Sequence, residues 1–389
     1  MVRQFQLARV PAIIFRPGCI SVLPALLVPH GKKVAIVTGK NSFLDSPAFT
    51  DLASSLADKN ISLKLISIKG EPSPGDIDPA AESLREDPVD AVVGIGGGAV
   101  LDAGKAIAAM AGVRESVVRF LEGVGDLNHP GTRLPYIAVP TTSGTGSEAT
   151  KNAVISRIGA NGFKKSLRHD NFVPDIALVD PGLTLNCPRD ITAASGMDCF
   201  TQLTEAFLSD KGSEYTDALA LEGLKAVRDN LKKCCTGGSD IEARSGMSFA
   251  ALTSGICLAN AGLGTVHGFA SSVGGLFRIP HGLVCGTLMA VANKVNVRKL
   301  RISNGKAALA RYAVLGRLFL GDKGKTDEYY IDGFIDHLQS LTEELGLPGL
   351  GTYGITSADI HRICIITENK NNPVRLELEE LEEILGSRI

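Results

Sequence analysis

The sequence has no tryptophan, and aromatic residues make up only 5% of its 389 residues. Aromatic platforms on which single-stranded nucleic acid stacks are therefore scarce. Basic residues are not in excess, because 40 Lys and Arg stand against 42 Asp and Glu, for a formal net charge of −2. Since phosphate backbones are bound by a surplus of Lys and Arg, this composition argues against nucleic acid as a partner.

Long apolar runs are also missing. The longest stretches are too short, or too often interrupted by glycine, for the roughly 20 residues of a membrane helix. The first ten residues carry charges and lack the apolar core of a signal peptide. Eight cysteines are present without a Cys-x-x-Cys pair, and several lie in apolar segments, as buried free thiols do. These features predict a cytoplasmic protein in a reducing compartment, with no membrane partner.

Glycine, by contrast, is abundant, with 43 residues in the chain, which exceeds the usual share of about 7%. The first half contains short apolar runs separated by helix-compatible segments. The expected strands are Lys33–Thr38, Ile61–Ile68, Val89–Ile95, Pro135–Val139, Val154–Ser156 and Asp175–Val179. Such runs indicate a parallel sheet in an α/β domain. The polar, proline-rich segment Glu71–Pro79 between two of them is expected to be a loop.

The second half has the period and composition of helices. The expected helices are Ser195–Leu208, Tyr215–Cys234, Glu242–Leu263, Leu283–Asn296, Lys306–Leu318 and Tyr329–Leu345. The acidic segment Leu376–Leu385 has apolar residues at helical spacing and is expected to expose a charged face on a terminal helix. With a boundary near Pro181–Pro188, we predict an α/β dinucleotide-binding domain over residues 1–182 and an all-α domain over residues 183–389.

A glycine-rich segment, Gly94–Lys105 (GIGGGAVLDAGK), follows a predicted strand and begins a predicted helix. Glycine allows the backbone to approach a ligand, and the helix N-terminus offers free N–H groups to a diphosphate. The segment loosely satisfies the Gly-x-Gly-x-x-Ala dinucleotide pattern. It differs from the ordinary Rossmann case because it follows the third predicted strand and no acidic residue ends the next strand. A tight turn without a ligand is the alternative interpretation.

A second loop, Pro140–Thr150 (PTTSGTGSEAT), also follows a predicted strand and combines hydroxyl groups, glycines and a carboxylate. In an open parallel sheet, ligands bind outside the carboxyl ends of the strands, so both loops fall on the same edge. We expect this loop to contact a ligand, and Thr142 and Ser147 are candidate hydroxyls that orient it. The alternative is a solvated Ser/Thr turn.

A third group of residues lies in the helical half. His267 and His281 are two of only seven histidines, and glycines flank both. Asp198 lies near the start of an otherwise apolar helix, and Gln202 shares its face one turn later. One carboxylate and two histidines are suited to a three-ligand metal site with an open position. A buried core histidine and a helix-capping Asp198 would explain the same pattern without a metal.

Together these segments resemble the iron-containing alcohol dehydrogenase family (group III, with a dehydroquinate synthase-like fold). The family pattern GxGGGSxxDxxK is similar to Gly94–Lys105, with Ala99 in place of Ser, and PTTxGTGSExT matches Pro140–Thr150 in full. DPxLTxxxP resembles Asp180–Pro188, TAAxGxDxxxxxxE resembles Thr192–Glu205, and HGxAxxxGG…PHG resembles His267–Gly282. The opening Ile14–Gly18 is similar to the family's first hairpin, and the resemblance spans residues 12–296.

The resemblance implies a dinucleotide-binding α/β domain, a helical domain and a cleft between them. The implied cofactor contacts are Gly97, Gly98, Ala99, Asp102, Thr141, Thr142, Asn152 and Lys164. The implied metal ligands are Asp198, His267 and His281, with Gln202 at a fourth position where iron-dependent members carry histidine. A further family histidine is replaced by Ser271. Because related enzymes use one Asp and two His for zinc, the metal is expected to be iron or zinc.

The function implied is an NAD(P)-dependent alcohol dehydrogenase or aldehyde reductase acting on a small alcohol or aldehyde, as a homodimer or larger homo-oligomer. A dehydroquinate synthase-like cyclase is one alternative, although Lys and Arg are scarce near the proposed ligands. A nucleotide-binding protein that has lost catalysis is another. The first expected strand ends at Gly39, where a carboxylate would repel a 2′-phosphate. Gly39, with Lys40 and Ser42 nearby, therefore favours NADP over NAD.

Overall fold

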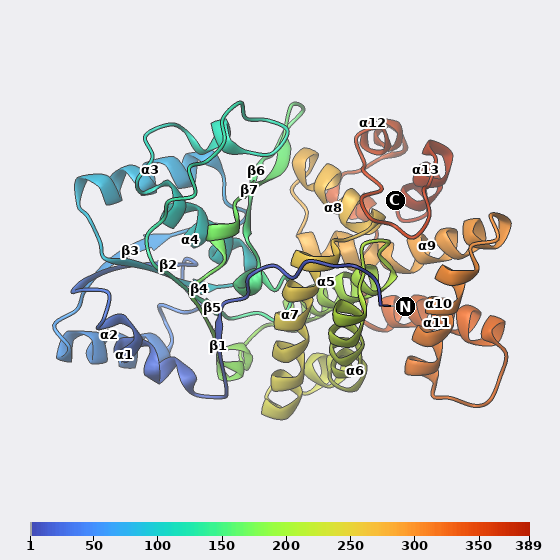
Figure 1. Cartoon of the computed structure of the whole chain (residues 1–389), viewed down its shortest axis with the longest axis horizontal. Helices are drawn as coiled ribbons and strands as arrows, with labels where there is room; N and C mark the ends of the chain where they lie inside the picture. Colours follow the sequence, from blue (N-terminus) through green and yellow to red (C-terminus); the bar gives the residue numbers. More distant parts are fainter. Residues whose placement is uncertain (1) are drawn as a thin grey trace.

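The computed structural model describes residues 2–389 and contains a sheet-based half followed by a helical half (Figure 1). A six-stranded sheet organises the first half, with all neighbouring strands parallel. In sheet order its strands are β1 (Ala12–Phe15), β8 (Ile176–Val179), β5 (Tyr136–Pro140), β4 (Ala91–Gly96), β2 (Lys33–Thr38) and β3 (Ser62–Ser67). The predicted α/β fold class is confirmed, and the strand of the glycine-rich segment is the fourth in the chain because β1 precedes the predicted ones.

Helices cover both faces of this sheet because its central strands are apolar on both sides. The helices of this half are α1 (Leu23–Leu27), α2 (Pro47–Asp58), α3 (Pro74–Glu86) and α4 (Gly98–Met110). In β2, Val34 and Ile36 join the core beneath α1 and α2, whereas Ala35 and Val37 join the core beneath α3 and α4. Alternate side chains of a strand point to opposite faces, so a continuous apolar run fits a sheet covered twice.

A two-stranded antiparallel hairpin, β6 (Asn152–Arg157) and β7 (Phe163–Arg168), follows β5 and stands outside the main sheet. Strand β6 packs on α4, and both strands contact a helix of the second half. The expected strand Val154–Ser156 is confirmed, but its place in a separate hairpin, and β7 itself, were not predicted. The hairpin therefore carries Asn152 and Lys164 from the sheet-based half toward the helical half.

The second half contains helices only. They are α5 (Arg189–Leu208), α6 (Glu214–Thr236), α7 (Ile241–Ala261), α8 (Thr265–Leu276), α9 (His281–Ile302), α10 (Lys306–Leu320), α11 (Asp327–Glu344), α12 (Ile360–Cys364) and α13 (Leu378–Gly386). Helix α5 lies at the centre, where it packs against α6, α7 and α9. The predicted all-α class is confirmed, although α8 was missed and α5 begins six residues before its predicted start at Ser195.

The two halves meet through backbone that only glycine allows to come so close. Gly146, with φ +62°, lies against Gly255 of α7, and a Cβ on Gly146 would stand 2.4 Å from the Gly255 nitrogen. The 3-10 turn Ser147–Ala149 then rests on α7. The chain start also bridges the halves, since it runs from β1 to the helical half (Figure 1). Arg3 forms ion pairs there with Glu214 and Asp217 of α6.

Two local predictions were wrong. The expected loop Glu71–Pro79 becomes the first turns of α3 at Pro74, because Ser73 caps the helix reciprocally with Asp76 and proline is favourable at the first helical position. The expected opening hairpin is absent from the described residues, since β1 pairs in parallel with β8 instead.

After β1 the chain turns, because an aspartate side chain at the end of β8 accepts hydrogen bonds from two backbone N–H groups. Asp180 accepts from Gly18 and Ile20 at 2.8 and 2.9 Å.

Regarding membranes, no single helix within residues 2–389 has the length and hydropathy to cross a bilayer. The bent pair α7 and α8 meets those two criteria jointly.

Candidate metal centre and nucleotide-binding edge

Three helices bring a carboxylate, two imidazoles and a thiol together in the helical half. Asp198 lies in the middle of α5, His267 in the first turn of α8, and His281 is the first residue of α9. Cys285 lies one turn after His281 on the same helix. Since Gly282 has no side chain, α9 can begin directly against α5, where a Cβ would stand 2.3 Å from the Ala194 oxygen.

The donor atoms of this cluster are close and mostly buried. Nε2 of His267 lies 3.2 Å from Oδ1 of Asp198, and Nε2 of His281 lies 3.7 Å from the same oxygen. Together with Sγ of Cys285, one donor atom from each residue lies within 4.8 Å of the others. Among residues 2–389, this is the one group of three or more His, Cys, Asp or Glu side chains with this spacing. The predicted Asp198, His267 and His281 are therefore brought together, and Asp198 does not cap a helix.

A second carboxylate orients His267. Oε2 of Glu205 lies 2.6 Å from Nδ1 of His267, while Oε1 accepts a 2.7 Å hydrogen bond from the N–H of Val266. Because a carboxylate accepts hydrogen bonds, Nδ1 carries the proton and Nε2 faces Asp198. A carboxylate behind the imidazole in this way fixes the tautomer and orientation that a metal ligand needs.

The charges of the cluster favour a cation next to Asp198. Burial opposes ionisation of Asp198, but His281 and His267 outweigh it and lower the pKa of Asp198 to about 2. Burial likewise opposes the imidazolium of His267, yet Cys285, Glu205 and Asp198 raise its pKa well above the ordinary value. Burial, with Lys164 next in importance, lowers the pKa of His281 to about 4, so this imidazole is a neutral donor at pH 7.

This donor set fits a divalent cation. Bonds of about 2.0–2.2 Å at a tetrahedral ion place nitrogen and oxygen ligands about 3.3 Å apart. The observed separations of 3.2 and 3.7 Å between Asp198 and the two histidines are close to that edge length. Imidazole and carboxylate are also the donor types that iron and zinc accept. Asp198, His267 and His281 can therefore hold such an ion with little rearrangement.

Gln202 lies one turn beyond Asp198 and is also buried. Its Oε1 accepts a 3.1 Å hydrogen bond from the hydroxyl of Ser254 in α7. Ser271, at the other position where the resemblance implied a histidine, donates to the backbone oxygen of His267 at 2.9 Å. The side chains at both positions thus have hydrogen-bond partners in the protein.

The glycine-rich turn and the Ser/Thr loop adjoin at the carboxyl edge of the sheet. Gly96, at the end of β4, is in register with Pro140, at the end of β5. A Cβ on Gly97 would stand 3.3 Å from the Thr142 hydroxyl oxygen, and one on Gly98 would overlap Thr145 at 2.5 Å. The two predicted loops therefore form one surface in front of the α4 N-terminus, as the strand order required.

The first turn of α4 presents free backbone donors on this surface. Gly97 caps the helix with its backbone only, and Gly98 and Ala99 are the first helical residues. The N–H of Thr141 is occupied, because it donates to the Gly96 oxygen at 2.9 Å. A helix N-terminus of this kind attracts a diphosphate through its N–H groups and dipole.

Hydrogen bonds of Asp102 in α4 fix the Ser/Thr loop, through Ser147, and the start of β6. Asp102 accepts a short hydrogen bond from the Ser147 hydroxyl and another, of 2.9 Å, from the N–H of Val154 in β6. Lys105, fully buried, donates to the Ser147 oxygen at 2.9 Å and the Asn152 oxygen at 2.7 Å. The hydroxyl of Ser147 thus faces inward, whereas Thr142 borders the glycine turn.

Lys164 connects the nucleotide-binding edge to the metal cluster. It projects from β7, its side chain is 6% exposed, and its Nζ lies 3.0 Å from Oε2 of Glu71. Burial opposes ionisation of Glu71, but the charges of Lys164 and His281 hold the pKa of Glu71 below its usual value. Asn152, on β6, directs its amide toward Ser166 at 3.5 Å. Lys164 therefore lies against α8, where a Cβ on Gly274 would stand 2.9 Å from its Cδ, whereas the side-chain contact of Asn152 is within the hairpin.

The end of β2 is followed by open space beside the backbone. A Cβ on Gly39 would meet no atom within 4 Å, and Lys40 and Ser42 are exposed.

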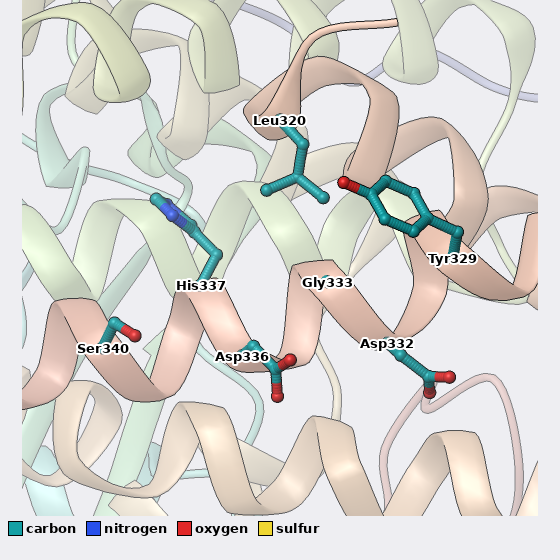
Figure 2. A pocket seen from close by; sticks show the side chains of 7 residues that line it. All are labelled: Leu320, Tyr329, Asp332, Gly333, Asp336, His337 and Ser340. Atoms are coloured by element: carbon teal, nitrogen blue, oxygen red, sulfur yellow. The ribbon is translucent and has the colours of Figure 1, made fainter. Parts of the chain in front are cut away.

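A separate hollow lies between α10 and α11, where Asp332 and Asp336 border it (Figure 2). It contains none of the predicted site residues, so the arrangement of donor groups, and not this hollow, locates the candidate site.

Comparisons with known proteins agree with this arrangement. Residues 11–181 match the family described as "Iron-containing alcohol dehydrogenase", and residues 192–389 match "Fe-containing alcohol dehydrogenase family, C-terminal". The chain belongs to the iron-containing alcohol dehydrogenase family. It is 30% identical over 360 residues to the NAD-dependent methanol dehydrogenase of Bacillus methanolicus, covering 91% of each chain.

Two further similarities extend over nearly the whole chain. Identity to the NADPH-dependent butanol dehydrogenase of Clostridium saccharobutylicum is 29% over 364 residues, covering 91% of each chain. The structure superposes on that of the alcohol dehydrogenase from Oenococcus oeni with a TM-score of 0.88 and 26% identity, covering 99% of this chain and 100% of the other. The family resemblance of the five motifs is thereby confirmed, together with the dehydroquinate synthase-like fold.

Sequence reasoning missed two residues in this member of the iron-containing alcohol dehydrogenases. Glu205 closes the TAAxGxDxxxxxxE motif, so its position in that motif was the available signal. Cys285 follows His281 by four residues on a helix, and this i, i+4 spacing would have placed both on one face. Neither role is visible within one segment, because each depends on how the faces of α5, α8 and α9 converge.

Proposed function

We propose that this chain is an NAD(P)-dependent, metal-assisted alcohol dehydrogenase or aldehyde reductase acting on a small alcohol or aldehyde. The observation that carries the proposal is the cluster of Asp198, His267 and His281, beside which Lys164 reaches in from the nucleotide-binding half. Metal donors and a diphosphate-binding turn on two adjoining domains are what a hydride transfer between a nicotinamide and a coordinated oxygen requires. We assign the two domains to residues 1–182 and 183–389.

In the helical domain, Asp198, His267 and His281 hold the cation, and Glu205 orients His267 through Nδ1. A divalent cation bound there supplies Lewis acidity toward an alcohol or carbonyl oxygen. The apolar, mostly buried surroundings of these residues exclude water and strengthen electrostatic interactions at that oxygen. Gln202 lies one turn beyond Asp198, with its Oε1 in a hydrogen bond from Ser254, and we propose that it stands beside the cation but outside the ligand set.

In the α/β domain, Gly97, Gly98 and Ala99 hold the diphosphate at the α4 N-terminus. The residues that would surround the remainder of the nucleotide are Thr141, Thr142, Asn152 and Lys164, and a bound nicotinamide would supply or accept the hydride. Asp102 acts from beneath, because its hydrogen bonds to Ser147 and Val154 fix the Ser/Thr loop and the hairpin. Thr142 is the hydroxyl we assign to orienting the bound ligand.

We further propose NADP as the preferred cofactor. The open space at Gly39, with exposed Lys40 and Ser42 nearby, supports a 2′-phosphate at this end of β2. The two relatives differ in this respect by name, one being NAD-dependent and the other NADPH-dependent. The choice in this chain therefore depends on its own residues at the strand end.

A cytoplasmic location and a homodimer or larger homo-oligomer complete the proposal. All eight cysteines are free, which supports a reducing compartment. Strand β1 is an outer strand of the six-stranded sheet, and Ile13 on it is 41% exposed. The free edge of such a strand is a surface on which a second copy can pair. Size-exclusion chromatography with light scattering would measure the mass of the resulting oligomer.

The decisive experiment follows absorbance of the reduced nicotinamide with a panel of small alcohols and aldehydes, using NAD(H) and NADP(H) in parallel. Protein loaded with iron or zinc is compared with protein stripped by a chelator. We expect turnover with at least one alcohol–aldehyde pair, loss of turnover on chelation, and recovery on adding the metal back.

Each other outcome has a distinct meaning. Full activity after chelation would contradict the role of Asp198, His267 and His281. Nucleotide binding without turnover across the panel would favour a protein that has lost catalysis. Turnover of a phosphate-bearing cyclase substrate, with none of the panel accepted, would favour the lyase alternative.

A further inference from the structure

Cys285 belongs to the metal cluster although it lies outside the five family motifs, the last of which ends at Gly282. Its thiol is buried on α9, one turn after His281. Its Sγ lies 3.6 Å from Nε2 of His267 and 3.8 Å from Nε2 of His281. The two imidazoles therefore direct toward Cys285 the same nitrogen atoms that they direct toward Asp198.

These distances correspond to the edges of a coordination tetrahedron. With metal–sulfur bonds of about 2.3 Å and metal–nitrogen bonds of about 2.0–2.1 Å, sulfur and nitrogen ligands stand about 3.6 Å apart. Nitrogen and oxygen ligands stand about 3.3 Å apart. The separations of 3.6 and 3.8 Å from Cys285, and of 3.2 and 3.7 Å from Asp198, follow this pattern. Four of the six edges of a tetrahedron formed by these residues are thus close to the expected lengths, and the other two are no longer than 4.8 Å.

The other candidates for a fourth ligand are less well placed. Gln202 is engaged with Ser254, and Ser271 donates to the backbone of its own helix. Burial alone does not distinguish Cys285, because Cys257 is equally buried. The Sγ of Cys257, however, faces a backbone oxygen of α6 at 3.7 Å, far from any group of metal donors. Position among donors, and not burial, is what sets Cys285 apart.

We propose that Cys285 is the fourth protein ligand of the metal, a thiolate that completes the set Asp198, His267 and His281. This inference rests on the metal site of the proposed function. A soft thiolate in a tetrahedral site favours zinc over iron, whereas an added imidazole would not make that distinction as strongly. The centre of this chain is therefore a zinc site with one sulfur ligand. Four protein ligands also leave a substrate oxygen only a fifth position or the place of Cys285.

X-ray absorption at the zinc edge, recorded on the full-length zinc-loaded protein, tests this directly. We expect one sulfur neighbour at about 2.3 Å in addition to nitrogen and oxygen neighbours. Cys285→Ser should remove that sulfur shell and weaken zinc at least about tenfold, since even outer-shell partners of a ligand contribute that much. Cys257→Ser, which alters an equally buried thiol, should retain both the sulfur shell and the wild-type zinc affinity.

A cobalt-loaded sample gives an independent signature. Thiolate coordination adds a sulfur-to-cobalt charge-transfer band, which should be present in the wild type and in Cys257→Ser and lost in Cys285→Ser. The ratio of zinc to iron affinity should fall in Cys285→Ser, because removing the soft ligand affects zinc more. Thermal unfolding of each metal-free variant identifies any that is misfolded, and Cys285→Ala provides a second substitution in that case.

The outcomes separate this inference from the proposed function. Zinc bound without a sulfur neighbour, or with one that persists in Cys285→Ser, would overturn the thiolate ligand and leave the metal-assisted dehydrogenase intact. A wild-type protein that binds neither zinc nor iron would overturn the metal site itself and the thiolate with it.

Discussion

The two halves of the molecule build their parts of the candidate site in different ways. In the α/β half, the nucleotide-binding edge consists of two short segments, each contiguous in sequence and each placed by the end of a neighbouring strand. In the helical half, the donors come from α5, α8 and α9, and up to 87 residues separate Asp198 from Cys285. Backbone N–H groups dominate the first part, and side-chain donors make up the second.

This difference matters for how each part can fail. A turn formed by local backbone conformation depends on residues within a few positions, so its failures should stay local. A cluster assembled by packing three helices depends on every contact that fixes their relative positions. We therefore expect substitutions at the metal cluster to leave nucleotide binding intact, and substitutions at the nucleotide-binding edge to leave metal content intact.

The largest effect is expected for His281→Ala. It removes a neutral nitrogen donor, so the metal content of the purified protein should become undetectable. Turnover should fall at least about 100-fold, since a Lewis acid contributes several kcal/mol to the stabilisation of charge. Binding of NADPH, followed by its own fluorescence, should be retained because Gly97–Ala99 belong to the other half. Loss of NADPH binding together with the metal would show that the halves are not separable.

A smaller loss is expected for Glu205→Gln. The charged partner of His267 Nδ1 becomes a neutral amide, so metal affinity should weaken by about 10–100-fold. Because Glu205 acts through His267, an excess of metal should restore kcat, with unfolding temperature close to that of the wild type. Glu222→Gln, which changes an exposed side chain of α6, is the matched control and should change neither property. If excess metal leaves kcat low, Glu205 has a role beyond positioning.

Gly39→Asp should change the nucleotide half alone. The carboxylate enters open space at the end of β2, hydrogen-bonds ribose hydroxyls and repels a 2′-phosphate. Preference should shift toward NAD by about 1–3 kcal/mol, measured as the ratio of kcat/KM values for the two cofactors. Metal content should not change. If the wild-type protein already has the higher kcat/KM with NAD, the interpretation of this strand end is wrong.

Where the halves meet, Glu148 should make stability depend on pH. Burial raises the pKa of Glu148 to about 7, although the charge of Lys105 opposes this. Between about pH 4.5 and pH 7 the folded protein therefore binds a proton that the unfolded chain does not, and the free energy of unfolding should fall as pH rises. The contribution is on the order of 1–3 kcal/mol. In Glu148→Gln this part of the slope should disappear, and an unchanged slope would assign it to other groups.

The smallest effect is expected for Gln202→His. An imidazole replaces a weaker amide oxygen one turn after Asp198, so iron should bind more tightly, by up to about tenfold. The gain is limited because the hydrogen bond from Ser254 is lost. Titration of iron into the metal-free protein measures the change, with Ser254→Ala as a control for that lost bond. Unchanged affinity would show that residue 202 does not face the ion.

Several features of the fold followed from local sequence because they depend on local rules. Continuous apolar runs predicted β2, β4 and β5 to within a few residues, since strands buried on both faces must be apolar throughout. The helices of the second half were predicted for a similar reason, from their apolar period. Helix α8 was missed because its three glycines and two serines are poor helix formers, although in the fold it packs against β7. Pro and Gly in the first turn of α3 predict a loop, whereas the Ser73–Asp76 cap makes this segment the start of a helix.

The sequence by itself determined the family, the division into sheet and helices, and the residues of the nucleotide-binding edge, because each is encoded within one segment. It also named Asp198, His267 and His281, through motifs whose residues have matching positions in the family. Only the tertiary structure decided that Cys285 joins them, that Glu205 stands behind His267, and that Gln202 is engaged with Ser254. Those facts depend on how three helices pack at close range, and the directions of side chains across a helix interface are set by contacts that no single segment contains.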